Sequence, residues 1–163
     1  MLRAFTKIAP ILVFCLFSFG NGVSDSFDFE NISYRGIIPG ISTSANVLSI
    51  LGNPEVQKSR VYVYEKESVV VELVPGKQVV MTVQLILIPN SDVLRIYNLK
   101  GNPGLAEKLG SLYPLEKMKS YPKAKITRPP GYTLVWISKA GRSVGFTYEG
   151  ADNKLTQVNL INY

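Results

Sequence analysis

The chain has 163 residues, 46% of them hydrophobic, which suits one ordinary domain or two small ones and excludes global disorder. It carries 18 Lys and Arg against 12 Asp and Glu, no histidine, and a single cysteine, Cys15. A disulfide within the chain is therefore excluded, and if Cys15 is removed with an N-terminal leader, a transition-metal site would need carboxylates alone. We expect no metal and no cofactor.

Residues 1–22 are typical of an export signal peptide. Arg3 and Lys7 precede an apolar run over 8–19, which is too short for a membrane-crossing helix of roughly 20 residues. The alternative is a retained membrane anchor. Lipid attachment at Cys15 is not expected, because two bulky residues precede it where lipoprotein processing prefers a small one. We expect an exported protein, periplasmic or extracellular, with a mature net charge of about +4.

The segment 23–34 is polar and acidic, with Asp28 and Glu30 interleaved with Phe27 and Phe29. Its carboxylates could hold calcium only in an ordered loop that supplied further oxygen ligands. We expect a flexible mature N-terminus.

Residues 36–54 predict a turn, one short helix and a stop. The Ser42 hydroxyl can cap the helix N-terminus by accepting a free backbone N–H. Gly52 suits the left-handed position after the helix, and Pro54 prevents continuation. The expected apolar face consists of Val47, Leu48, Ile50 and Leu51.

Three strands are expected next, at 61–64, 69–74 and 79–86, since these runs are rich in branched and aromatic side chains. Pro75-Gly76 between the last two favours a hairpin. The helix can cover one face of this antiparallel sheet, which makes residues 35–90 a helix-plus-sheet module of the α+β class.

The second half repeats this order loosely. A helix is expected over Leu115–Tyr121, before Pro122, and strands at 132–137, 143–148 and 155–161. We therefore predict an α+β fold in which a helix followed by a three-stranded antiparallel sheet occurs twice in tandem, with 91–163 as the second, divergent module. The alternative is one α+β domain whose second helix only happens to look like the first.

The pattern Ile-x-Pro-Gly-x-Ser-Thr-x-x-x-Val-Leu-x-x-Leu-Gly-x-Pro within 36–54 resembles the start of the BamE-like outer-membrane assembly proteins. Their relatives include the two-repeat beta-lactamase-inhibitor proteins. The resemblance covers about fifty residues well and the second half weakly. It implies an exported, non-enzymatic α+β protein that binds another protein in the cell envelope.

No residue pattern indicates catalysis. Glu65 and Glu67 flank Lys66 in what is more simply an exposed turn. The chain lacks the sequence signatures of a nucleophile elbow, a phosphate loop or a dinucleotide site. We expect no enzyme.

Two surfaces are candidates for binding. Tyr62 and Tyr64 alternate with valines, so the tyrosines face outward if the valines face the helix, and outer tyrosines suit protein recognition. They could equally protect cross-strand hydrogen bonds. The other candidate is a basic segment with only Glu116 as a nearby acid: Lys117, Lys119, Tyr121, Lys123, Lys125 and Arg128.

The basic segment could attract anionic lipid or an acidic protein surface, although solvated lysines are the simpler interpretation. Nucleic acid is not expected, because no series of stacking aromatics accompanies the cations. The sequence thus predicts an exported protein-binding scaffold or assembly factor with an envelope or secreted protein as partner. The alternatives are a secreted enzyme inhibitor, which would use the tyrosine-bearing strand, and a peripheral binder of anionic lipid.

Overall fold

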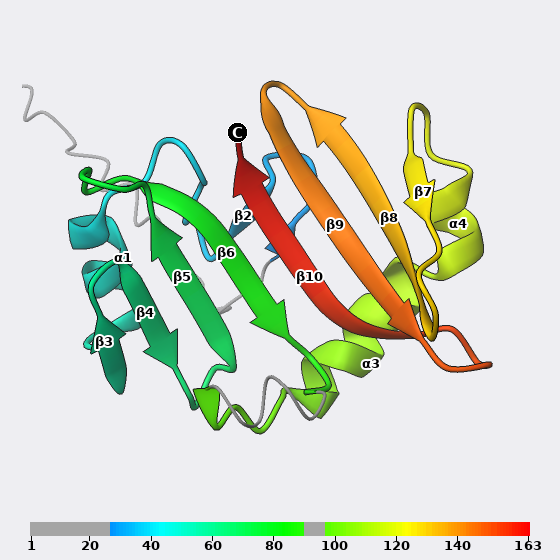
Figure 1. The fold of residues 1–163 in the computed structure, drawn as a ribbon, viewed down its shortest axis with the longest axis horizontal. Helices are drawn as coiled ribbons and strands as arrows, with labels where there is room; N and C mark the ends of the chain where they lie inside the picture. Colours follow the sequence, from blue (N-terminus) through cyan, green and yellow to red (C-terminus); the bar gives the residue numbers. More distant parts are fainter. Residues whose placement is uncertain (1–26, 90–96) are drawn as a thin grey trace, which may run out of the picture.

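The computed structural model describes residues 27–89 and 97–163, and its main feature is one antiparallel sheet of eight strands. The predicted signal peptide lies outside the described residues. Across the sheet the strands follow the order β3-β4-β5-β6-β10-β9-β8-β7 (Figure 1). In chain order they are β3 (Val56–Lys58), β4 (Val61–Tyr64), β5 (Val69–Leu73), β6 (Val80–Ile86), β7 (Lys125–Thr127), β8 (Tyr132–Lys139), β9 (Arg142–Glu149) and β10 (Lys154–Asn162).

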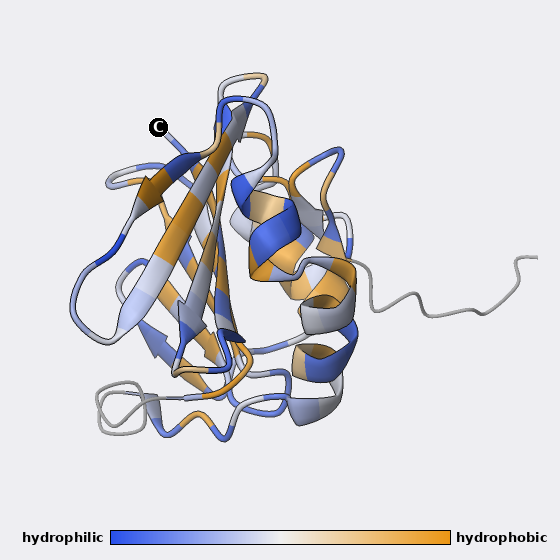
Figure 2. Cartoon of the chain, turned by 90° about the vertical axis from the view of Figure 1, so that its right-hand side faces the viewer, coloured by the Kyte–Doolittle hydropathy of each residue, from blue (hydrophilic) through white to orange (hydrophobic). Residues whose placement is uncertain are grey.

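Three helices and a small hairpin of the described residues cover one face of this sheet, and none of these three helices lies over the other face (Figure 2). The helices are α1 (Ser44–Leu51), α3 (Pro103–Leu112) and α4 (Leu115–Lys119). The hairpin consists of β1 (Phe27–Asp28) and β2 (Ser33–Tyr34). No helix in the described part of the chain is long and apolar enough to cross a bilayer.

The predicted fold class, an α+β helix and three-stranded sheet repeated twice, is wrong. The structure is mainly β, because β6 and β10 pair directly and merge all strands into one sheet: Val83 faces Leu160, and Leu85 faces Val158. A single cluster of buried side chains also extends over both halves of the chain. The predicted boundary between the two modules, at residues 90 and 91, falls in a segment that the structure does not describe.

Most individual strands are nevertheless where the sequence predicts them. The six expected runs correspond to β4, β5, β6, β8, β9 and β10. The expected turn at Pro75-Gly76 joins β5 to β6, with Gly76 at a φ of +71°. The outer strands β3 and β7 and the helix α3 were not predicted.

Helix α1 is confirmed, but Thr43 caps it in place of Ser42. The Asn46 N–H donates to Thr43 Oγ1 (3.3 Å), and the Thr43 N–H donates to Asn46 Oδ1 (2.8 Å), which forms a reciprocal cap. Ser42 Oγ instead accepts from the Ile38 N–H (2.9 Å). Gly52 adopts a φ of +79° at the helix end, as expected.

The predicted apolar face of α1 is only partly correct. Val47 is fully buried, whereas Leu48 and Ile50 are 37% and 41% exposed. Eight residues make little more than two turns, so the helix can turn only a narrow stripe toward the sheet.

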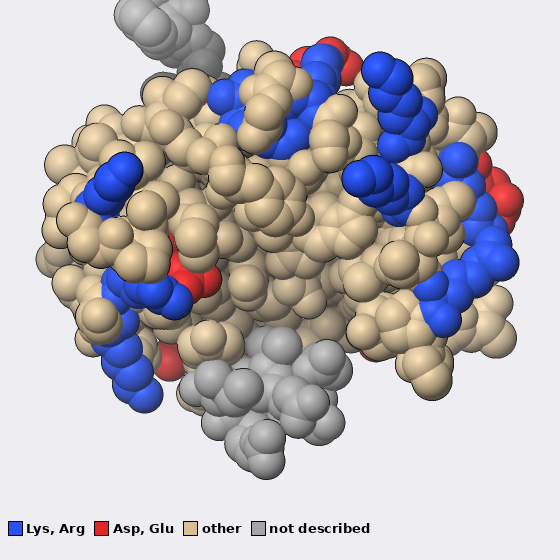
Figure 3. Space-filling view, turned by 45° about the horizontal axis from the view of Figure 1, so that its top comes forward, with Lys and Arg blue, Asp and Glu red and all other residues tan. Residues whose placement is uncertain are grey.

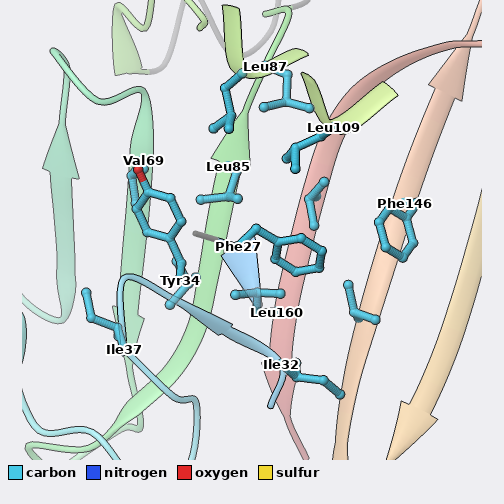
Figure 4. Close-up of a cluster of buried hydrophobic side chains, with 14 of the residues drawn as sticks. Phe27, Ile32, Tyr34, Ile37, Val69, Leu85, Leu87, Leu109, Phe146 and Leu160 are labelled. Atoms are coloured by element: carbon cyan, nitrogen blue, oxygen red, sulfur yellow. The ribbon is translucent and has the colours of Figure 1, made fainter. Parts of the chain in front are cut away.

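The hairpin of β1 and β2 corrects the prediction of a flexible segment at 23–34, for its described part. Phe27, Ile32 and Tyr34 are buried in the core between the hairpin and the sheet (Figure 4). Phe27 contacts Phe146 of β9 edge-to-face, with ring centroids 6.0 Å apart. The aromatic residues point inward and the acidic residues outward, so this polar-looking segment buries enough apolar surface to become ordered.

Candidate binding face

We call the sheet surface opposite the helices the open face. One row of cross-strand partners crosses it from end to end, and because side chains alternate between faces, the whole row lies on this side. In the six inner strands, their neighbours along the strand belong to the core on the other side. From β3 to β7 the row is Val56, Val63, Val70, Gln84, Asn159, Gly145, Trp136 and Lys125.

The β3 end of the open face is apolar. Val63, Val70 and Ile86 form a buried cluster with Leu99, and Tyr97 packs against it. A hollow of about 350 Å³ lies beside this cluster, lined by Val56, Lys58, Val61, Val63, Glu65, Tyr97 and Asn98.

The middle of the open face is lined by uncharged polar side chains. Gln157 Nε2 donates to Asn159 Oδ1 (2.8 Å), and the hydroxyls of Ser138 and Ser143 are hydrogen-bonded at 2.8 Å. Thr82, Ser143 and Thr147 are less than 9% exposed although none of α1, α3 and α4 covers them. Figure 3 shows uncharged residues over the middle of this view, with Lys and Arg side chains and some Asp and Glu around them.

Trp136, the single tryptophan of the chain, lies across the neighbouring strand. A Cβ atom placed on Gly145 would be 2.6 Å from two atoms of the Trp136 ring, closer than real atoms approach. The glycine therefore makes room for the indole, which rests on the strand backbone and stays partly exposed.

The structure separates the predicted basic segment into two groups. Lys117 and Lys119 belong to α4, on the helix side: Lys117 Nζ donates to the Leu112 carbonyl (2.8 Å), and Lys119 pairs with Glu116 (2.6 Å). Tyr121 is half-buried, with its ring edge-to-face against Phe29 at 5.1 Å.

The second group lies along the outer strand β7. Lys125 is the cross-strand partner of Trp136, and Lys123 and Arg128 lie just before and just after the strand. All three are exposed. From residue 117 to residue 148 the chain has no Asp or Glu but seven cations: Lys117, Lys119, Lys123, Lys125, Arg128, Lys139 and Arg142. Lys119 pairs with Glu116 and Lys139 with Glu30, so the exposed cations along the outer strand are Lys123, Lys125 and Arg128.

Tyr62 and Tyr64 are not on an outer face, which corrects the other predicted surface. They are 5% and 1% exposed, and they face Val71 and Val69 in the core. The Tyr64 hydroxyl donates to the Gly52 carbonyl (3.2 Å), and burial raises the pKa of Tyr64 to about 12. The alternation was predicted correctly, but the valines take the open face.

The remaining perturbed groups have structural partners. The side chain of Asn31 donates to Asp28 (2.6 Å) and lowers the pKa of that carboxyl, and the hydrogen bond from Lys139 to Glu30 raises the pKa of Lys139. Burial raises the pKa values of Tyr113 and Tyr148. In residues 27–89 and 97–163, no three acidic, His or Cys side chains gather in a way that could hold a metal ion.

A larger hollow of about 860 Å³ lies on the other side of the sheet, between the helices and the turn that joins β9 to β10. Its lining mixes apolar and charged residues, including Ala106, Leu115, Tyr148, Glu107 and Lys154. It contains none of the residues predicted from the sequence to bind.

The sequence patterns did not single out four residues of the open face as candidates for binding: Trp136, Gly145, Gln157 and Asn159. A glycine inside a strand of branched and aromatic residues is the signal that could have found them, since it often marks a close approach of another group.

Fold and face together define a mainly β protein with one eight-stranded antiparallel sheet, helices on one side and a polar, aromatic-bearing face on the other. No protein-family model matches the chain, and no curated protein matches its sequence. Among solved structures it aligns with a DUF4309 family protein (YjgB) from Bacillus subtilis subsp. subtilis str. 168. The two are 14% identical over 80% of this chain and 84% of that chain, with a TM-score of 0.46. The alignment assigns neither a family nor an activity.

Proposed function

We propose that this protein is an exported, non-enzymatic binding protein of the cell envelope, and that the open face is its binding surface. The observation that carries the proposal is the arrangement of Trp136 over Gly145 beside the amides of Asn159 and Gln157. Export is supported by the charged and apolar pattern of residues 1–22.

An antiparallel sheet can leave one face in water, so exposure alone would not indicate binding. The open face differs from an ordinary solvated face because the described side chains of its middle are uncharged and most of its hydroxyls are shielded by their neighbours. Side chains held by mutual hydrogen bonds lose little freedom when a partner binds. Such a surface is prepared for recognition.

An inhibitor that inserts Tyr62 and Tyr64 into an enzyme is not proposed, since both rings are core residues. A partner-binding scaffold needs no such insertion. It can use the whole row from Gln84 to Lys125, which crosses five strands.

Photocrosslinking in intact cells tests the proposal. A crosslinking amino acid at Gln157 on the open face should capture an envelope component, whereas the same amino acid at exposed Ala45 on α1 should not. Cell fractionation, with mass measurement of the mature N-terminus, tests export in the same cells. A protein left uncleaved in the cytoplasm, or equal capture from both positions, would refute the proposal.

A further inference from the structure

We infer that the end of the open face formed by Trp136 and Lys125 binds a chain of acidic polysaccharide. The inference rests on the proposed function, because it names the partner of the same face. It joins three observations: a flat aromatic ring, amides and hydroxyls beside it, and cations with no acid close by in sequence.

The aromatic ring comes first. The six-membered ring of Trp136 rests on the Gly145 backbone, so the sheet fixes its position. A sugar ring presents a flat patch of C–H groups, which pack well on the electron-rich face of an aromatic ring. Because Trp136 is partly exposed, its indole can provide such a platform.

The polar side chains continue the same row. Asn159 is the partner of Gly145 on the next strand, and Gln157 is hydrogen-bonded to it. Neighbouring strands lie about 4.8 Å apart, close to the length that one sugar adds to an extended chain. A polysaccharide that crosses the strands would therefore meet the indole with one sugar and the amides with the next ones.

The charges select an acidic chain. Lys125 is directly beside Trp136 on the outer strand, and Arg128 follows that strand by one residue. Thr127, the last residue of β7, faces Leu134, so Arg128 lies toward the end of β8 at which Tyr132 faces Glu149, whereas Lys125 lies farther along, at Trp136. Attraction to carboxylates spaced along a sugar chain would thus act at Lys125, beside Trp136.

The same features favour a polysaccharide over an acidic protein. A protein interface usually has an apolar, well-packed centre with aromatic anchors in pockets. Between β6 and β9 the middle of the open face has amides, hydroxyls and a glycine in place of such a centre, and the apolar Ile86 and Ile161 lie toward the two ends of these strands. Sugar hydroxyls match these groups.

The test is affinity electrophoresis of the whole chain in gels that contain polygalacturonate, a carboxylated polysaccharide, or neutral dextran. We expect retardation by polygalacturonate alone, weakened at least tenfold by W136A and by K125E and relieved by salt. The matched control is K108E, a charge reversal at an exposed position of α3, which should bind within twofold of the parent.

The single tryptophan gives a second measurement that needs no variant. Polygalacturonate should shift or quench Trp136 emission, whereas dextran should not. Circular dichroism shows whether W136A is folded. If W136A is not folded, the change in Trp136 emission of the parent protein on addition of polygalacturonate tests the inference instead.

Several results would overturn the inference. These are an absence of retardation, retardation that K125E weakens but W136A does not, or an unchanged emission. Tighter binding to single-stranded DNA or to phosphatidylglycerol vesicles through the same residues would replace the polysaccharide with those partners. Capture from Gln157 in cells without polygalacturonate binding would overturn this inference and leave the proposed function in place.

Discussion

Replacing Gly145 by alanine tests whether Trp136 lies over the strand as described. In the middle of a strand, alanine is ordinarily more favourable than glycine by roughly 0.5–1 kcal/mol. Here the new methyl group would be 2.6 Å from the indole, and forcing an extra group into a packed site costs about 1–3 kcal/mol. We therefore expect G145A to lower the free energy of unfolding by about 0.5–2 kcal/mol.

The background W136A removes the obstacle, so G145A should there raise the free energy of unfolding by about 0.5–1 kcal/mol. The two substitutions should thus be coupled by about 1–3 kcal/mol in a double-mutant cycle. Urea unfolding followed by circular dichroism measures the free energy of unfolding of the parent, G145A, W136A and the double variant. In G145A itself the displaced indole should also emit at a longer wavelength.

The control is G110A on α3, where an added Cβ has open space within 4 Å. It should stabilise the protein by up to about 1 kcal/mol, with or without Trp136. Equal costs of G145A in both backgrounds would refute the placement of the indole.

Three further predictions concern stability. Phe27→Ala should lower the free energy of unfolding by about 3 kcal/mol in urea, because Phe27 is 7% exposed and contacts Phe146 and Tyr113. A cost below about 0.5 kcal/mol would show that the hairpin is not packed on the sheet. Thr43→Ala should lower the free energy of unfolding by about 1 kcal/mol, because it removes the α1 cap. Thermal unfolding measures the change, with Ala45→Gly as a control within the helix. An unchanged stability of Thr43→Ala would contradict the role of Thr43 as the cap. Asp28 has a folded pKa below its ordinary 3.8, so its carboxylate stabilises the fold above that pH and loses this effect as pH falls through the folded value. Asp28→Asn should therefore destabilise the protein at pH 7, with the difference shrinking in acid, and a difference constant with pH would contradict this.

The strands of the sheet were readable because branched and aromatic residues recur in short runs with turn residues between them. Such runs located β4 to β6 and β8 to β10. The strands β3 and β7 have three residues each, too short for an alternation to stand out.

The sequence did not show which face of the sheet is covered by the helices, nor which strands pair with each other across the two halves of the chain. Val61 and Tyr62 are both apolar enough for a core, so their alternation defines two faces without saying which is covered. The pairing of β6 with β10 joins residues far apart in the chain and has no local signal. The indole over Gly145 is equally a contact between strands, visible only once the register is known.

The pairing of β6 with β10 also has a consequence for the order in which the molecule is assembled. β6 begins at Val80 but obtains its second neighbour only from β10, which begins at Lys154. A chain made from its N-terminus would have β3 to β6 available early, with an unpaired edge along Val83 and Leu85 until the later strands arrive. Exposed strand edges recruit other chains, so the interval before β10 joins is when this protein is most open to aggregation.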